Sequence, residues 1–168
     1  MTHQEKIIYA AGFVDGEGCI GVDHNVIKRT YKTTGRYVEY NNFQLRLQVA
    51  QKVREPLDLL VELFGGAVKP KVLHGSTYFH WELYNQKALV AISQLFPYMI
   101  VKRESAWNGM EFAEMQVATR PKATVARSAS DVVKMHAFNA QSRKLNQRNS
   151  VATDYTKIEQ KETSPIIQ

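Results

Sequence analysis

The stretch Tyr9-Ala-Ala-Gly-Phe-Val-Asp-Gly-Glu-Gly18 decides the fold, because small residues are followed by two carboxylates at the point where a helix must end. A helical pattern of apolar residues precedes the stretch, and its glycines can adopt turn geometry. Small side chains leave little bulk between two helices, so a second backbone can approach closely. We therefore predict that this helix docks on a copy of itself and delivers an acidic group to the bottom of the seam.

Simpler interpretations of the same residues exist. An Ala-Ala-Gly run is common in tightly packed internal helices, and Asp-Gly is a common turn dipeptide. The spacing Gly16-x-Gly18-x-x-Gly21 also matches the dinucleotide-binding fingerprint. That fingerprint needs a strand before it and a helix after it, whereas here a helical pattern precedes and the strand-like residues 19–22 follow. We therefore expect no nucleotide cofactor.

The composition is typical of one globular domain inside a cell. The chain has 168 residues, 44% of them hydrophobic, which suffices for one ordinary core. No apolar run approaches the roughly 20 residues of a membrane span, and the N-terminus lacks the layout of a signal peptide. A single cysteine excludes an internal disulfide framework, and the five histidines show no zinc-ligand spacing. We expect an intracellular protein with no membrane partner and no structural zinc.

Positive charge gathers in two segments of the chain, whose formal net charge is +6. Seven basic residues between positions 28 and 54 stand against one acid, Glu39. Seven more between positions 120 and 148 stand against Asp131. This distribution predicts a polyanionic partner.

Three segments have the pattern of half-buried strands. Residues 42–49 and 78–84 alternate between apolar and polar side chains, and residues 68–72 set two lysines on one face, with a hairpin turn at 74–77. The apolar members, which we expect to face a core, are Phe43, Leu45, Leu47, Val49, Phe79, Trp81 and Leu83. The outward members are Asn42, Gln44, Arg46, Gln48, Lys69, Lys71, Tyr78, His80 and Glu82. Amides and cations on such a face suit the edges of bases in a major groove, although an ordinary solvated sheet face would also be polar.

Helices separate the strand pairs and give an α+β order. We predict helices at residues 54–64, 86–96 and 102–115, and a basic, weakly amphipathic helix at 123–145. The predicted order is helix, two strands, helix, two strands, helix. We divide the chain into a core at residues 1–118, a basic helical extension of the same domain at 119–147, and a flexible tail at 148–168.

With this motif and this order of elements, the chain resembles the LAGLIDADG homing endonucleases, in particular their single-motif class. The resemblance covers roughly residues 5–115, although the final acid of the motif is Glu17 here and more commonly Asp in the family. It implies an αββαββα fold with a saddle-shaped antiparallel sheet and C-terminal helices. It also implies a homodimer that cuts double-stranded DNA at a long pseudo-palindromic site, in an organelle (chloroplast or mitochondrion) or in a microbial cytoplasm.

The resemblance implies a set of catalytic residues. Glu17 and the Gly16 carbonyl would bind a divalent metal, Mg²⁺, with Mn²⁺ or Ca²⁺ able to substitute in binding. Gln51, in the segment Gln48-Val-Ala-Gln-Lys52, would position a water molecule. Lys102, in Val-Lys-Arg before the third helix, would polarise the attacking water or stabilise the leaving phosphate.

The resemblance also implies DNA contacts and a dimer interface. Lys28, Arg29, Lys32 and Arg36 are expected in a loop between strands, where they would reach the DNA flanks. The remaining DNA contacts would be Gln44, Arg46, Gln48, Lys69, Lys71, Tyr78 and His80. The helix seam would use Ala11, Gly12 and Asp15, the last as a cap or an intersubunit partner.

One departure from the family pattern leaves an alternative open. The position of a common family arginine falls on Glu55, so Arg54 and Arg103 are the candidates to replace it. The competing function is a non-cleaving nucleic-acid binder on the same fold, either an intron RNA maturase or a DNA-binding regulator. Retention of Glu17, Gln51 and Lys102 favours cleavage, because a pure binder has no use for that set.

Overall fold

A computed structural model describes residues 1–73, 75–119 and 127–151 of the chain. Its elements follow the predicted αββαββα order and are then joined by a further helix. They are α1 (His3–Glu17), β1 (Gly18–Thr30), β2 (Tyr37–Gln51), α2 (Glu55–Phe64), β3 (Lys69–Leu73), β4 (Ser76–Tyr84), α3 (Asn85–Leu95), the 3₁₀ helix η1 (Phe96–Tyr98), α4 (Arg103–Ala118) and α5 (Ala129–Val151). No helix of the described residues is both long and apolar enough to span a membrane.

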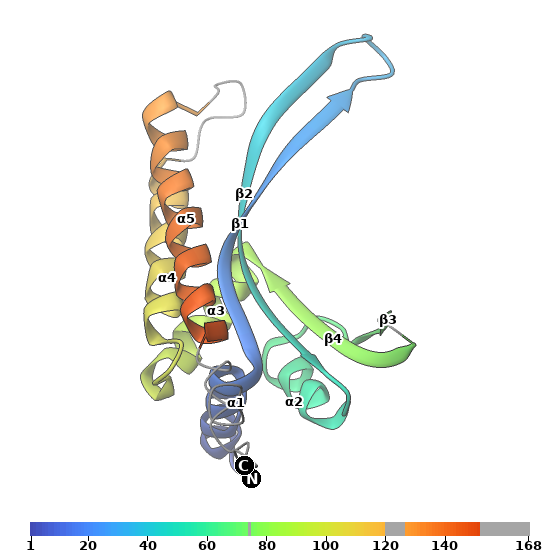
Figure 1. The fold of residues 1–168 in the computed structure, drawn as a ribbon, viewed down its shortest axis with the longest axis vertical. Helices are drawn as coiled ribbons and strands as arrows, with labels where there is room; N and C mark the ends of the chain where they lie inside the picture. Colours follow the sequence, from blue (N-terminus) through green and yellow to red (C-terminus); the bar gives the residue numbers. More distant parts are fainter. Residues whose placement is uncertain (74, 120–126, 152–168) are drawn as a thin grey trace, which may run out of the picture.

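The four strands form one antiparallel sheet in the order β1-β2-β4-β3. Two hairpins, β1–β2 and β3–β4, meet where β2 pairs with β4. The sheet curves, the β1–β2 hairpin projects away from the helices, and the side between this hairpin and β3–β4 carries no helix of the described chain (Figure 1). We call this side the open face. The architecture is α+β, as predicted.

The core lies between the other side of the sheet and the helices. Phe43, Leu45, Leu47 and Val49 are all buried, which confirms the alternation predicted for β2. The fully buried Trp81 of β4 reaches the same core, and its indole N–H donates to the Gly65 carbonyl at 2.9 Å. That bond joins the sheet to the end of α2.

The β1–β2 hairpin is longer than the sequence pattern predicted. Pairing continues without a break from Gly18 opposite Val49 to Thr30 opposite Tyr37. Lys28 and Arg29 therefore lie within β1, so placing them in a loop was wrong; only residues 31–36 form the turn. Alternation of apolar residues marks a strand only where one side is buried, and the far part of this hairpin has no helix behind it.

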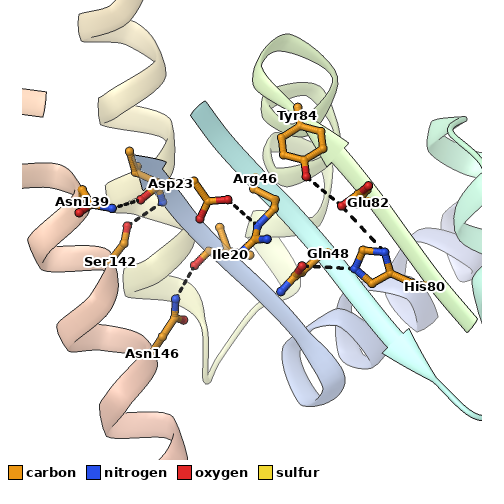
Figure 2. Close-up of polar contacts among 11 residues, drawn as sticks. Ile20, Asp23, Arg46, Gln48, His80, Glu82, Tyr84, Asn139, Ser142 and Asn146 are labelled. Atoms are coloured by element: carbon orange, nitrogen blue, oxygen red, sulfur yellow. Dashed lines mark hydrogen bonds and ion pairs between the residues drawn. The ribbon is translucent and has the colours of Figure 1, made fainter. Parts of the chain in front are cut away.

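Helix α5 covers the edge of the sheet. It begins and ends about six residues later than the predicted helix at 123–145, of which residues 123–126 lie outside the described chain. Asn139 and Asn146 donate to the carbonyls of Val22 and Ile20, at 2.6 and 3.3 Å, and the Val22 N–H donates to the Ser142 hydroxyl at 2.9 Å (Figure 2). Polar side chains thus face the edge strand β1, which explains the weak amphipathic pattern.

We predicted that a flexible tail begins at residue 148, but α5 continues to Val151. The rest of that prediction, residues 152–168, lies outside the described residues.

Candidate nucleic-acid interface and acidic site

The motif helix ends beside a hollow on the open face. Glu17 is the last residue of α1, and Gly18 begins β1 directly after it. A Cβ on Gly18 would lie 2.7 Å from the Val14 carbonyl oxygen, so only glycine fits this abrupt transition. Glu17 is exposed and lines a hollow of about 450 Å³. Its other lining residues come from β1, β2, β3 and β4 and are Cys19, Gln48, Ala50, Lys71, Tyr78 and His80.

Asp15 fastens the end of α1 to the segment before α4. Its carboxylate accepts backbone N–H bonds from Ile100 and Val101, both at 2.9 Å, and from Lys102 at 2.7 Å. Burial acts to raise the pKa of Asp15, but the three backbone donors and the Lys102 charge outweigh it and lower this pKa below its ordinary 3.8. Asp15 is therefore an ionised structural residue inside the protomer.

The side chain of Lys102 makes a second contact between the segment before α4 and the end of α1. Its side chain is only 7% exposed, and its ammonium donates to the carbonyls of Asp15 and, at 3.1 Å, of Gly16. These carbonyls belong to the last turn of α1, where lysine side chains commonly satisfy free acceptors. The structure thus places Lys102 against the backbone that carries Glu17, and gives the Gly16 carbonyl a partner within the chain.

Gln51 is the last residue of β2 and pairs with Phe79. It has the strand parity of Val49, on the helix side, whereas Gln48 and Ala50 line the Glu17 hollow. Gln51 is half-buried at this strand end.

The two candidate replacements for the family arginine both have partners. Arg54 precedes α2, which begins at Glu55, and its Nε donates to the Asp58 carboxylate at 3.1 Å. The Arg103 guanidinium lies 4.5 Å from the centre of the Phe96 ring. Neither contact directs an arginine toward Glu17.

The exposed stripe of α1 differs from the predicted seam. Ala11 has no exposed surface and belongs to the core, so its predicted place in a dimer interface is wrong: no surface is left for a partner. Asp15 is likewise used within the protomer. Gly12 is exposed, and a Cβ built on it would meet nothing within 4 Å. Ile8 and Tyr9, each 48% exposed, lie one turn earlier on α1. We call Ile8, Tyr9 and Gly12 together the bare stripe of α1.

Two groups of polar side chains lie on the open face, one joining β1 to β2 and one joining β2 to β4 (Figure 2). Arg46 donates to Asp23 at 2.9 Å, and the hydroxyl of Tyr84 donates to Glu82 at 2.9 Å. His80 bridges the neighbouring residues, with 3.3 Å to Gln48 and 3.9 Å to Glu82. We did not predict Asp23 or Tyr84 as site residues. Counting on from Cys19 in steps of two, through Gly21, would have placed Asp23 on this face.

The other predicted DNA contacts are distributed around the open face. Gln44, on β2 opposite Asp23, is half-buried. The exposed cations are Lys28 and Arg29 on β1, Lys32 and Arg36 in the turn, and Lys69 and Lys71 on β3. The structure therefore surrounds a polar sheet face with positive charge.

One protomer offers few ligands for a metal ion. Within the described ranges, no three His, Cys, Asp or Glu side chains gather closely enough to hold an ion. The Glu17 carboxylate and the Gly16 carbonyl offer only oxygen, which Mg²⁺ and Ca²⁺ prefer. The donor chemistry fits a hard divalent cation, but further ligands must come from a second copy, water or substrate.

The family follows from a sequence comparison that covers the motif helix, the sheet and the beginning of α4. The model of the LAGLIDADG endonuclease family matches residues 10–105. This chain belongs to the LAGLIDADG endonuclease family. A search of curated proteins found no match.

Solved structures of homing endonucleases share the fold. I-CvuI, in complex with the I-CreI target in the presence of Mg and with the DNA not cleaved, is 20% identical with a TM-score of 0.64, over 86% of this chain and 85% of that chain. An archaeal intron-encoded homing endonuclease complexed with DNA is 20% identical with a TM-score of 0.61, over 84% of each chain. I-TnaI is 19% identical with a TM-score of 0.61, over 84% of this chain and 93% of that chain.

Proposed function

We propose that the protein is a homodimeric, divalent-metal-dependent endonuclease that cuts double-stranded DNA at a long, nearly palindromic site. The observation that carries the proposal is the exposed Glu17, held at the end of a clamped helix beside a polar sheet face surrounded by cations. Solved relatives of the same fold that are complexed with DNA support it.

The open face would bind DNA in the major groove. Arg46 and Gln48 would meet base edges, while the exposed cations, Lys28 and Arg29 among them, would meet phosphates on the flanks. Because phosphate contacts release counterions, we expect affinity to fall steeply with salt.

The bare stripe of α1 would meet the same stripe of a second copy. Gly12 allows the two backbones to approach, and the half-exposed Ile8 and Tyr9 supply apolar surface. A two-fold axis along this seam would bring the two Glu17 carboxylates together, one for each DNA strand. The second carboxylate would add to the few ligands that one protomer supplies, and water or the DNA would provide the rest.

The residues near Glu17 have separate parts in the reaction. A divalent cation held by Glu17 and the Gly16 carbonyl would neutralise negative charge on the phosphate. It would also stabilise the 3′-oxygen as that leaving group departs. Lys102 keeps the Gly16 carbonyl in place and adds a fixed positive charge behind it. Gln51 lies on the helix side of β2, so it could orient a water molecule for the reaction only if its half-buried side chain turned past the strand end toward Glu17.

The Glu17→Gln substitution tests the metal assignment. The amide keeps the size of the side chain and loses the charge, so the variant should bind DNA and no longer cleave it. Glu62→Gln on α2 is the control, because that exposed carboxylate pairs only with Lys6 among the described residues. Cleavage of a plasmid library at the wild-type rate by Glu17→Gln would refute the assignment.

The Gly12→Leu substitution tests the dimer. The leucine would push the paired helices apart, so sedimentation should show a monomer. Gln94→Leu adds the same side chain to the exposed side of α3 and should leave the dimer intact. A dimeric Gly12→Leu variant contradicts the proposed seam.

A non-cleaving binder, either an RNA maturase or a DNA-binding regulator, is the second candidate. The partners of Arg54 and Arg103 favour it, because neither of these two candidates is held by a contact near Glu17. Binding of a defined DNA or intron RNA without cleavage in Mg²⁺ or Mn²⁺ would select it over the endonuclease.

A further inference from the structure

Besides Glu17, the carboxylates of Asp23 and Glu82 also lie on the open face, where a polyanion would bind. Asp23 of β1 and Glu82 of β4 are about one third exposed, at 32% and 27%. A carboxylate repels DNA phosphates, so it is costly on such a face unless it orients a donor or accepts a hydrogen bond from a base. Each of the two acids contacts a side chain that can donate to a base.

The clearer case is the contact between Asp23 and Arg46. The Arg46 Nε lies 2.9 Å from the Asp23 Oδ2, and the two side chains come from neighbouring strands (Figure 2). Partial burial raises the pKa of Asp23, and the Arg46 charge opposes that rise. An ion pair that is partly withdrawn from water holds its geometry better than one at full exposure.

Arg46 is held from its other side as well. In the sheet register it stands opposite Tyr84, and the guanidinium acts to lower the pKa of that phenol. Burial and Glu82 raise the same pKa more strongly, so Tyr84 stays a neutral donor and directs its hydroxyl hydrogen to Glu82 at 2.9 Å. The guanidinium therefore lies between its ion-pair partner on β1 and a phenol of the neighbouring strand β4.

Counting donors shows what Arg46 has left for a ligand. A guanidinium carries five N–H groups. Asp23 takes the one on Nε, and the Tyr84 oxygen takes at most one more. Among the described residues no further acceptor engages Arg46, so about three donors remain, all on the two terminal nitrogens. A pair of terminal N–H groups matches the O6 and N7 acceptors of guanine in the major groove.

Space for a base edge lies next to these donors. Arg46 and Asp23 line a hollow of about 620 Å³ between β1 and α5, to which Arg143 of α5 also contributes. Arg143 adds positive charge at the far wall, where a phosphate could lie.

We propose that Asp23 holds Arg46 in the orientation that reads a guanine, so that each half of the DNA target carries one guanine whose recognition depends on both side chains. The proposal rests on the proposed function and names a feature of its target. Arg46 is the reading residue, and Asp23 is a positioning residue that acts through it.

The test is a selection from randomised palindromic duplexes. Bound duplexes are recovered in Ca²⁺ and cleaved ones in Mg²⁺, and both pools are sequenced. The wild-type protein should prefer guanine at one position of each half-site by roughly 5- to 150-fold, the range of one bidentate contact. Arg46→Lys keeps the charge and loses the fork, so preference at this position should fall below about 3-fold, with the other positions unchanged.

Asp23→Asn separates positioning from folding. The amide keeps the shape but accepts more weakly, so the guanine preference should fall to a value between those of wild type and Arg46→Lys at the same position only. Glu62→Gln should leave every position unchanged. Thermal unfolding of each variant is measured alongside, because loss of stability alone would weaken all positions together.

The outcomes distinguish the two levels of the proposal. Failure of the wild-type protein to select or cut any duplex overturns the proposed function. Selection by the wild type with an unchanged guanine preference in Asp23→Asn overturns the positioning role alone. An equal loss of affinity for all sequences in Arg46→Lys means a phosphate contact and overturns the reading role.

Discussion

The two halves of the β1–β2 hairpin share one backbone ladder but differ in what lies behind them. In the half near α1, Ile20, Leu45 and Leu47 are fully buried. In the far half, Val26 and Tyr40 remain 46% and 48% exposed although their strands pair just as continuously. Strand pairing alone therefore does not make a core. The near half stabilises the fold, and the far half leaves its side chains available to a ligand.

The strongest test of this comparison is to truncate one apolar side chain in each half to alanine. Leu45→Ala should lower the free energy of unfolding by about 2–5 kcal/mol, because a fully enclosed side chain leaves a cavity. Val26→Ala in the far half should change it by no more than about 0.5 kcal/mol. Urea denaturation measures both, and equal losses would show that the far half also stabilises the fold.

Asp15 tests how firmly the near half is joined to the helices. In Asp15→Asn an amide group meets backbone donors, so we expect a loss of about 2–3 kcal/mol at neutral pH. The exposed Asp58→Asn, which breaks only a surface pair with Arg54, should cost less than about 1 kcal/mol.

The effect of Asp15 should also depend on pH. Its pKa is lower in the folded chain than the ordinary 3.8, so its contribution is present above that value and is lost as pH falls through the folded pKa. The difference between wild type and Asp15→Asn should therefore shrink in acid denaturation series below about pH 3.8. A constant difference across that range would mean that the carboxylate charge is not what stabilises the joint.

Ser142 tests the edge of the near half. Ser142→Ala removes the acceptor of the buried Val22 N–H and a partner of Asn108, so we expect a loss of about 1–2 kcal/mol. Hydrogen exchange at the Val22 amide should accelerate. Ser93→Ala, whose hydroxyl bonds mainly within its own exposed helix turn, is the control and should change little. An unchanged Val22 exchange rate would mean that α5 does not protect this edge.

The smallest effect on stability is expected in the far half. Arg29 is exposed and stacks over Tyr31 at 5.1 Å, so Arg29→Ala should alter the free energy of unfolding by less than about 0.5 kcal/mol. If the far half contacts phosphates, the slope of log affinity against log salt should fall by about one. Lys87→Ala on α3 removes an exposed charge from the helix side, and its slope should equal that of the wild type. Identical slopes for both variants would remove the far half from the DNA interface.

Much of the fold could be predicted from local patterns. The alternation of residues 42–49 identified the buried face of β2, and Pro56 and the glycines after Phe64 bracketed α2. The far half of the hairpin was missed, because a strand exposed on both sides has no burial pattern. The amphipathic pattern of α5 was weak, since Asn139 and Ser142 satisfy β1 and do not face solvent.

The candidate site was predictable in its residue types and less so in its contacts. Small residues in α1 indicated a close approach, but the sequence could not say that Ala11 approaches the core and Gly12 the surface. The pairing of Asp23 with Arg46 required the sheet register, which joins positions that no local pattern connects.

The sequence by itself determined that a helix ends in two acids, which strand face is polar, and that cations dominate around it. Only the tertiary structure decided the fate of each acid. Asp15 accepts hydrogen bonds from backbone donors 85 to 87 residues away and serves to stabilise the fold. Glu17, two residues later, stays exposed beside the open face. The reason is physical: helix and strand patterns depend on near neighbours, but whether a charge is satisfied depends on groups that only folding brings within hydrogen-bonding distance.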